Sequence, residues 1–255
     1  MNKNKHLFLL IVLIILLFII NYPFIDSAVE DFLQGSEKGF VERVVDGDTI
    51  IVDGHSVRLL GINTPEKGER YSKEAKEFLE NLILNKKVRL EGIENDMYFR
   101  KLRYVFLGGE NINLKIVREG LANVYILDDK NYEKELRNAW NNCIIENKNF
   151  CEKSENKCAD CVELKRFEKQ EIVFYNKCDF DCDLNDWTIK DEGRKKFIFE
   201  DFVLNKKKDI EIIVGEGRDT DEILFWKNEN YVWTSTGDTL FLRDSEGKLV
   251  LWEKY

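Results

Sequence analysis

The sequence contains few histidines and has no excess of positive charge. Only two histidines occur among 255 residues, His6 near the N-terminus and His55 in an expected turn. This scarcity argues against a histidine general base and against a histidine-rich metal site. The formal net charge of −9 argues against a protein that binds nucleic acid through overall electrostatic attraction. A few basic groups lining one cleft could still hold DNA or RNA.

Charge is also absent from the run Leu7–Ile25, which follows Lys3 and Lys5. An apolar stretch of roughly this length behind a basic flank predicts a membrane-spanning helix or a secretory signal. We expect residues 1–27 to be an uncleaved signal anchor, because Asp26 spoils the small-residue pattern of a cleavage site before Ala28. A cleaved signal peptide is the alternative. Either reading places the rest of the chain outside the cytoplasm, at the cell membrane or secreted.

Cysteine is missing from the first half of the chain. The six cysteines are Cys143, Cys151, Cys158, Cys161, Cys178 and Cys182. An even number in an exported chain predicts disulfides. Proximity along the sequence favours the pairs Cys143–Cys151, Cys158–Cys161 and Cys178–Cys182. A zinc site on the first four cysteines is the alternative, although only one Cys-x-x-Cys pair is present.

Alternating apolar residues and turn dipeptides fill residues 38–146. We expect strands over Phe40–Val45, Thr49–Val52, Val57–Ile62, Val88–Ile93 and Leu102–Leu107, and helices beginning at Ser72, Asn113 and Tyr132. In the first helix Ala75, Phe78, Leu79, Leu82 and Ile83 share one face. The fold class is therefore mainly β with α, and five strands with surrounding helices predict a Greek-key barrel of the oligonucleotide-binding (OB) type.

Residues 147–161 form a cysteine-containing linker, and residues 162–255 form a second domain. The second domain shows seven short strand patterns separated by turn signals. They are Glu171–Tyr175, Trp187–Lys190, Lys196–Phe199, Ile210–Val214, Ile223–Trp226, Thr239–Arg243 and Leu249–Trp252. Short strands at this spacing, without a long helical pattern, predict an antiparallel β-sandwich.

Oxygen-bearing side chains and arginines gather in the first domain. Asp48, Asn63 and the carbonyl of Thr64 could supply hard oxygens to Ca²⁺. Arg58 and Arg100 carry planar forks that match phosphate oxygens. Glu66 follows Pro65, whose fixed φ would aim it, and a carboxylate there could position or deprotonate water.

Each of these elements alone has a simpler structural explanation. Asp46-Gly47-Asp48-Thr49 is typical of a hairpin turn, a strand arginine is commonly solvated or salt-bridged, and Thr64-Pro65-Glu66 is typical of a turn. Their order and spacing together indicate a site that cleaves phosphodiesters.

Four ordered motifs resemble the staphylococcal-nuclease-like (thermonuclease) family. They are Val44–Ile50, Val57–Glu66, Asp96–Leu102 and Asn113–Ala122. The resemblance covers about Phe40 to Trp140 and implies a barrel that hydrolyses DNA or RNA with calcium. It further implies that Arg58, Glu66 and Arg100 are catalytic and that Asp48, Asn63 and Thr64 bind the metal. By the same resemblance Asp46 supports the metal shell and Tyr98 contacts the nucleotide.

Two positions depart from the family pattern. Asn63 stands where an aspartate is common, which predicts weaker calcium affinity. Phe99 replaces the usual glycine beside Arg100, and would be strained if that backbone needs a positive φ.

The second domain resembles the lamin tail domain family. The residues that carry the resemblance include Asp183–Asp191 and Gly237–Leu242, with Leu184 and Trp187 as core residues. The resemblance implies an immunoglobulin-like sandwich with a binding role toward an unknown ligand.

These observations together predict a monomeric, extracytoplasmic, membrane-anchored nuclease that depends on calcium and acts on DNA, RNA or both. The alternative is a catalytically weakened or inactive barrel that serves as a nucleic-acid or cell-surface binding module, which Asn63 and Phe99 would favour.

Overall fold

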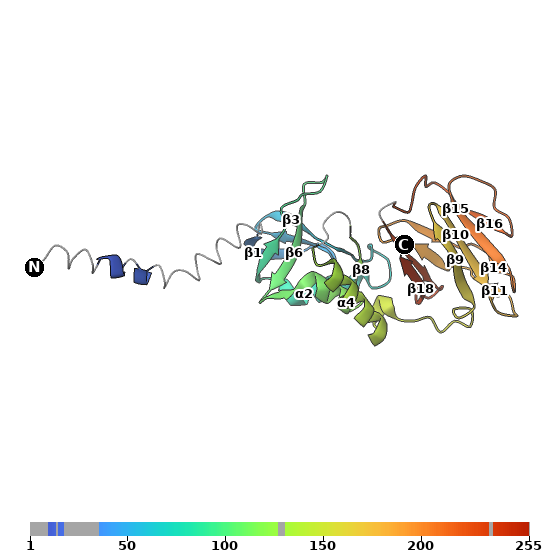
Figure 1. The fold of residues 1–255 in the computed structure, drawn as a ribbon, viewed down its shortest axis with the longest axis horizontal. Coiled ribbons are helices and arrows are strands. Elements are labelled where there is room, and N and C mark those ends of the chain that lie inside the picture. Colours follow the sequence, from blue (N-terminus) through green and yellow to red (C-terminus); the bar gives the residue numbers. More distant parts are fainter. Residues whose placement is uncertain (1–9, 14, 18–35, 127–130, 235–236, 255) are drawn as a thin grey trace, which may run out of the picture.

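The computed structural model describes residues 10–13, 15–17, 36–126, 131–234 and 237–254. Within these ranges the chain is mainly β, with few helices. A barrel and a second group of sheets lie side by side (Figure 1). Of the expected signal anchor, residues 1–9, 14 and 18–27 lie outside the described residues. No helix in the described ranges is long and apolar enough to cross a membrane.

Five strands form the barrel. They are β1 (Ser36–Val44), β2 (Thr49–Val52), β3 (His55–Leu59), β5 (Lys87–Glu91) and β6 (Lys101–Leu107). Their order is β3-β2-β1-β5-β6, and a parallel pairing of β3 with β6 closes the ring. The predicted five-stranded barrel is therefore confirmed. A short strand, β7 (Glu110–Asn111), extends the sheet beyond β6.

The β2–β3 hairpin follows from its turn residues. Asp53 and Gly54 have φ values of 44° and 76°, both in the left-handed region that a two-residue hairpin turn requires. The turn sets the register, in which Val52 pairs with His55 and Thr49 pairs with Arg58. Arg58 is thereby fixed opposite the Asp48-Thr49 end of β2.

The strand expected over Val57–Ile62 is broken, which is a correction to the sequence-based prediction. β3 ends at Leu59, and Gly61 turns the chain with a φ of 74°. A Cβ at Gly61 would lie 2.5 Å from Leu136 Cδ1, and the positive φ is strained for any residue with a Cβ, so glycine is favoured here. The chain then continues as β4 (Ile62–Asn63), which pairs with β8 (Asn123–Val124) instead of with the barrel.

Three α-helices and one 3₁₀ turn pack on the barrel. They are α2 (Ser72–Ile83), α3 (Ile112–Arg118), α4 (Glu133–Glu146) and η1 (Asn149–Cys151). In α2, Ala75, Leu79 and Ile83 are fully buried, as the four-residue spacing predicts. Phe78 and Leu82 pack partly buried against the same core, so the predicted face is confirmed.

Ten strands make up the C-terminal region. They are β9 (Val162–Glu168), β10 (Glu171–Asn176), β11 (Cys182–Asp183), β12 (Thr188–Lys190), β13 (Lys196–Ile198), β14 (Val203–Leu204), β15 (Asp209–Val214), β16 (Ile223–Trp226), β17 (Thr239–Arg243) and β18 (Leu249–Lys254). They form two four-stranded sheets, β16-β15-β10-β9 and β13-β12-β17-β18, and the pair β11-β14. All seven expected strands are present. The antiparallel expectation is wrong at one point, because β15 and β16 run parallel.

All six cysteines form disulfides, and the pairing corrects part of the expectation. Cys143 pairs with Cys151, as proximity predicts. The other two bonds join Cys158 to Cys182 and Cys161 to Cys178. They tie the segment before β9 to the β10–β11 connection, whereas pairing of nearest neighbours would have closed two small local loops. No cysteine is left free to hold zinc.

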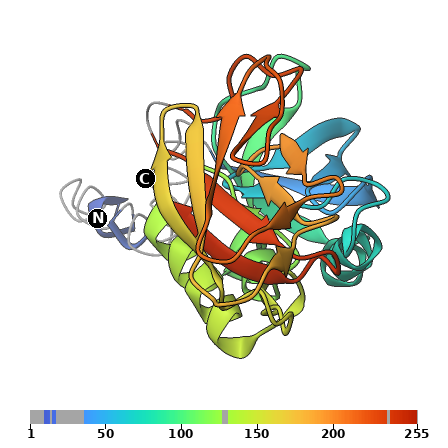
Figure 2. The ribbon, with the colours of Figure 1, turned by 90° about the vertical axis from the view of Figure 1, so that its right-hand side faces the viewer.

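The hydrophobic core of the barrel extends into the C-terminal domain, which also has a second core of its own. Trp140 of α4 lies 5.4 Å from the ring of Phe241 and 6.2 Å from that of Trp252, both on the β17–β18 pair. Figure 2 shows these strands lying over the helices of the barrel domain. Leu249 and Phe241 are buried in the same cluster as the barrel residues.

The segment 147–161 is part of this packing. Phe150 and Cys151 are buried, and the backbone of Leu249 exchanges hydrogen bonds with Glu152 and Ser154 at 2.8 Å each. Arg243, also buried, donates to the carbonyl of Phe150 at 2.6 Å. The segment between the domains therefore contacts both the barrel core and the strands of the C-terminal domain.

Candidate active site at the domain boundary

A buried ion pair joins β2 and β3 at the base of the site. Arg58 forms an ion pair with the carboxylate of Asp48, and both side chains are at most 10% exposed. The other Asp48 oxygen accepts hydrogen bonds from the backbone nitrogen and the hydroxyl of Thr64, each at 2.8 Å. Asp46 accepts from the backbone nitrogen of Asp48 at 3.1 Å and itself remains exposed. The turn Asp46–Asp48 is thus held by its own carboxylates.

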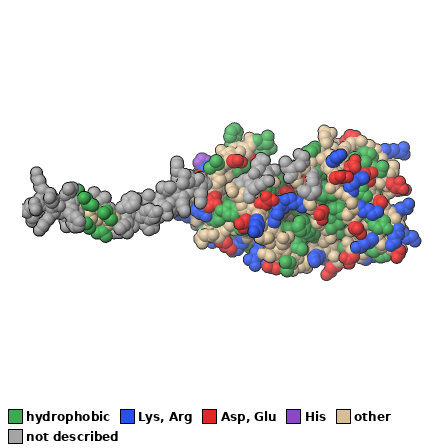
Figure 3. Space-filling model, in the orientation of Figure 1, with side chains coloured by type: hydrophobic (Ala, Val, Ile, Leu, Met, Phe, Trp, Pro, Cys, Tyr) green, Lys and Arg blue, Asp and Glu red, His purple; other side chains and the backbone are tan. Residues whose placement is uncertain are grey.

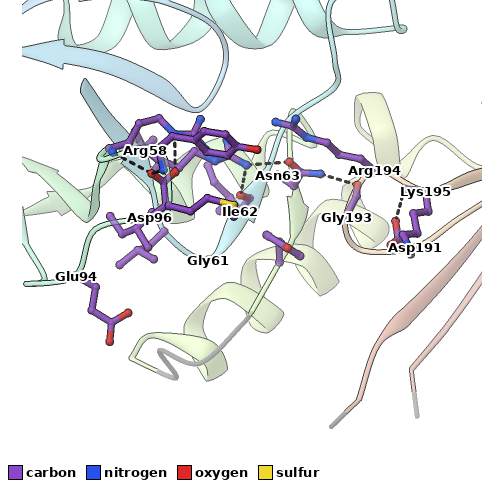
Figure 4. Close-up of a pocket in the computed structure, with 17 residues that line it drawn as sticks. Arg58, Gly61, Ile62, Asn63, Glu94, Asp96, Asp191, Gly193, Arg194 and Lys195 are labelled. Carbon is purple, nitrogen blue, oxygen red and sulfur yellow. Dashed lines mark hydrogen bonds and ion pairs between the residues drawn. The ribbon is translucent and has the colours of Figure 1, made fainter. Parts of the chain in front are cut away.

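Asn63 lies between the two domains. Its amide oxygen accepts a hydrogen bond from Arg58 at 2.9 Å. Its amide nitrogen donates to the carbonyl of Gly193 at 2.7 Å and to that of Glu192 at 3.3 Å. Figure 4 shows Arg58, Asn63 and Gly193 joined in one line across the boundary. An aspartate could not make these two donations, because an ionised carboxylate is an acceptor only.

The second arginine is held by the loop between β5 and β6. Arg100 donates to Asp96 twice, from its backbone nitrogen at 2.9 Å and from Nε at 2.6 Å. Burial acts to raise the pKa of Asp96, but hydrogen bonds from Arg100 and Tyr98 bring it below its ordinary value. The Arg100 guanidinium lies 5.6 Å from the centre of the Tyr98 ring. Asp96 therefore positions Arg100 as a charged, partly exposed group.

Phe99 has the positive φ that its position in the motif suggests. Its φ is 61°, in the left-handed region that disfavours a bulky residue. The ring gains no burial in return, since it is 89% exposed. Ile93, Met97 and Tyr98 on the same loop are exposed as well, and Figure 3 shows the hydrophobic group at the top of the barrel domain. Arg100 is nevertheless fixed, because its contacts run through Asp96.

Glu66 stands on the exposed side of the site. Its carboxylate forms an ion pair with Nε of Arg194 at 2.7 Å, and the two side chains are 47% and 64% exposed. Its backbone nitrogen donates to Glu69, which in turn pairs with Lys190 of the C-terminal domain at 3.0 Å. The Glu66 carboxylate is thus paired with a side chain from the other domain.

A pocket of about 580 Å³ lies between the domains. Arg58, Asn63, Tyr98 and Arg100 line it from the barrel (Figure 4). The loop 191–195 between β12 and β13 lines it from the other side. Glu66, Asp46, Asp48 and Thr64 lie outside its wall.

The charges of the site act on one another. The pKa of the Arg58 guanidinium is lowered to about 10, first by burial and then by the charges of Arg100 and Arg194. Asp46 and Glu66 act in the opposite direction. The charges of Arg100 and Glu66 therefore both act on Arg58, although Glu66 is not part of the pocket wall.

Known sequences match both parts of the chain. Residues 56–152 match the staphylococcal nuclease homologue family, and residues 164–255 match the Lamin Tail Domain family. An uncharacterized endonuclease of Escherichia coli O157:H7 is 33% identical over 116 residues, which cover 44% of this chain and 71% of that protein. The chain belongs to the family of staphylococcal nuclease homologues.

Two staphylococcal members of the family are named thermonucleases. The Staphylococcus hyicus protein is 46% identical over 94 residues, covering 32% of this chain and 56% of that protein. The Staphylococcus intermedius protein is 43% identical over 98 residues, covering 34% and 58%. The chain thus spans little more than half the length of these two nuclease homologues, and its own C-terminal region carries the lamin tail domain.

The calcium ligands implied by the family resemblance suit a hard cation in type, since they are carboxylate, amide and carbonyl oxygens. Among the described residues no group of three or more His, Cys, Asp or Glu side chains is placed to hold a metal. One oxygen of Asp48 and the amide oxygen of Asn63 are engaged by Arg58. Calcium would therefore compete with Arg58 for these oxygens.

Sequence reasoning missed two parts of this nuclease-homologue site. Tyr125, directly after β8, lines the pocket, and burial followed by the charge of Asp191 raises its pKa. The loop 191–195 contributes the opposite wall. A tyrosine two residues after Asn123 could have been suspected from its place after a strand. The loop offers no local signal, because its role depends on how the two domains pack.

Proposed function

We propose that this protein is a calcium-dependent nuclease that hydrolyses phosphodiester bonds of DNA, RNA or both. The observation that supports this most is the placement of Arg58 and Arg100 in the wall of one pocket at the domain boundary, with Glu66 paired to Arg194 of the opposite wall. The names of the staphylococcal relatives point the same way.

The two arginines would bind the phosphate undergoing cleavage. Arg58 and Arg100 present planar guanidinium groups, which pair with phosphate oxygens through two parallel hydrogen bonds and stabilise charge that builds up on phosphorus. Asp96 holds Arg100 in place, so that little reorganisation is needed when substrate arrives.

Glu66 would position the attacking water and accept its proton. An exposed carboxylate beside the arginines is suited to this, because a general base must reach the water next to the phosphorus. Asp48, Asn63 and the Thr64 carbonyl, supported by Asp46, would hold calcium, which polarises phosphate when bound.

Cleavage of single-stranded DNA and of RNA by the full-length chain, with calcium and with a chelator, tests this function. Glu66→Gln should lower kcat at least about 100-fold, because a general base contributes about that much or more. Its KM and melting temperature should stay close to wild type. Glu74→Gln, an exposed glutamate on α2 of the same domain, is the matched control and should leave the rate unchanged. Absence of calcium-dependent cleavage by the wild-type chain would contradict the proposed function. Full activity of Glu66→Gln would show that Glu66 is not the general base.

Asn63 favours a second candidate function, a binding module without catalysis. The expected carboxylate is missing there, and Arg58 already occupies the amide oxygen. In that case the full-length chain would bind single-stranded oligonucleotides and leave them intact in the same assay.

Location and assembly complete the proposal. Three disulfides are compatible with an oxidising, extracytoplasmic compartment. We propose that residues 1–27 anchor a monomeric chain to the membrane and that the lamin tail domain has a binding role.

A further inference from the structure

The loop 191–195 belongs to the lamin tail domain, yet it faces the nuclease pocket. It connects β12 to β13, and Asp191, Gly193, Arg194 and Lys195 line the pocket opposite Arg58 and Arg100. The pocket is therefore enclosed only when both domains are present.

Asn63 fastens this loop to the barrel. The two donations from its amide nitrogen end on consecutive carbonyls, those of Glu192 and Gly193. All three groups lie in a largely buried region, where losing a hydrogen bond is costly. One of the two residues that depart from the family pattern thus contacts the neighbouring domain.

The loop is also braced from within its own domain. Asp191 accepts a hydrogen bond from the backbone nitrogen of Lys195 at 3.0 Å. Glu192 is buried, its carboxylate accepts a hydrogen bond from the Thr239 hydroxyl, and its backbone nitrogen donates to the Asp238 carboxylate at 3.4 Å. The tip of the loop is consequently held at a defined place over the pocket, and Arg194 at this tip is exposed.

Arg194 has the properties of a phosphate-binding group. Its side chain is 64% exposed, and its ion pair with Glu66 is also exposed. Such a pair contributes little to stability and can exchange its carboxylate for a phosphate. Lys195 is less suited, because it already pairs with Glu229 at 2.8 Å and contacts the carbonyl of Tyr231.

We propose that Arg194 binds a backbone phosphate of the substrate, so that the lamin tail domain completes the nuclease site. This rests on the proposed nuclease function. In the free protein Arg194 holds Glu66, and in the complex it releases the carboxylate to the water and takes the neighbouring phosphate. Arg194 would thus join Arg58 and Arg100 as a third arginine at the place where the negatively charged nucleic acid binds.

The test compares Arg194→Ala with Arg218→Ala in the full-length chain. Arg218 is an exposed arginine of the same domain outside the pocket, so both variants lose one charge. For a single-stranded oligonucleotide, Arg194→Ala should lower kcat/KM about tenfold, mainly through KM, because a hydrogen bond to a charged group is lost. The slope of log KM against log salt should fall by about 0.7, as expected for one lost phosphate contact to a single strand. Arg194→Lys should lie between wild type and Arg194→Ala.

Two results would overturn the proposal. Identical behaviour of the two alanine variants would show that Arg194 does not contact substrate, and a faster Arg194→Ala would make the Glu66 contact an inhibitory one. Oligonucleotide binding measured by fluorescence anisotropy in chelator separates this from the parent proposal. If the wild-type chain binds but does not cleave, the nuclease function fails, while weaker binding by Arg194→Ala alone would still support the phosphate contact.

Discussion

The two halves of the site differ in what their charged groups touch. In the buried half, Asp48, Arg58 and Asn63 bond to one another and to backbone, and each is under 10% exposed. In the exposed half, Glu66 and Arg194 pair across the domain boundary while about half or more of each side chain meets solvent. A buried polar group is costly to separate from its partner, whereas an exposed pair exchanges partners readily. The buried half therefore keeps its geometry, whereas the exposed pair can exchange its partners.

Removing a buried arginine and a partly exposed one should show the largest difference in stability between the two kinds of contact. Arg58→Ala leaves the Asp48 carboxylate buried without its counter-charge and should lower the unfolding free energy by about 3–5 kcal/mol. Arg100→Ala, which removes a partly exposed pair with Asp96, should lower it by about 1 kcal/mol or less. Both should reduce cleavage strongly. Urea denaturation followed by tryptophan fluorescence measures the difference, and equal losses of stability would contradict the contrast.

Asn63→Asp tests the buried half from the other direction. The change adds a carboxylate to the proposed calcium ligands and should tighten calcium binding, which isothermal titration calorimetry measures. It also removes both hydrogen bonds to the 191–195 loop, each worth about 1–3 kcal/mol when a buried partner is left unsatisfied. Trypsin should then cleave after Arg194 or Lys195 faster.

Asn142→Asp on the exposed face of α4 is the matched control for charge. If Asn63→Asp bound calcium as the wild type does and resisted trypsin equally, the dual role of Asn63 would be wrong.

Phe99, on the exposed loop between β5 and β6, gives the smallest expected effect. Phe99→Gly should raise the unfolding free energy by about 1 kcal/mol, because a left-handed conformation disfavours any residue with a Cβ. Cleavage should change less than about threefold, since Asp96 holds Arg100. Phe99→Ala removes the ring but keeps the Cβ, so equal stabilities of the two variants would show that backbone strain is not the cause.

The elements that local chemistry determines could be predicted from the sequence. The strands of the barrel and seven of the later strands follow from apolar alternation and turn dipeptides, which act over a few residues. The positive φ at Phe99 could be anticipated because the family pattern usually has glycine at this position beside Arg100. The break at Gly61 was missed because the next two residues pair with β8, which lies far along the sequence.

Long-range pairing is what could not be predicted. Two of the three disulfides join cysteines that are not nearest neighbours, since the fold brings β11 against the segment before β9. Asn63 and Gly193 lie 130 positions apart, and nothing near either residue indicates that they meet. That the second domain lines the pocket is visible only once the packing is known.

The hydrophobic core that spans the boundary limits how this chain can be divided. Cutting it after α4 would leave Trp140 facing water in place of Phe241 and Trp252, and would strip the pocket of one wall. A barrel joined to another tail would keep this packing only if that tail carried a face like the one that Phe241 and Trp252 form. The matching faces of the two domains therefore belong together in any recombined chain.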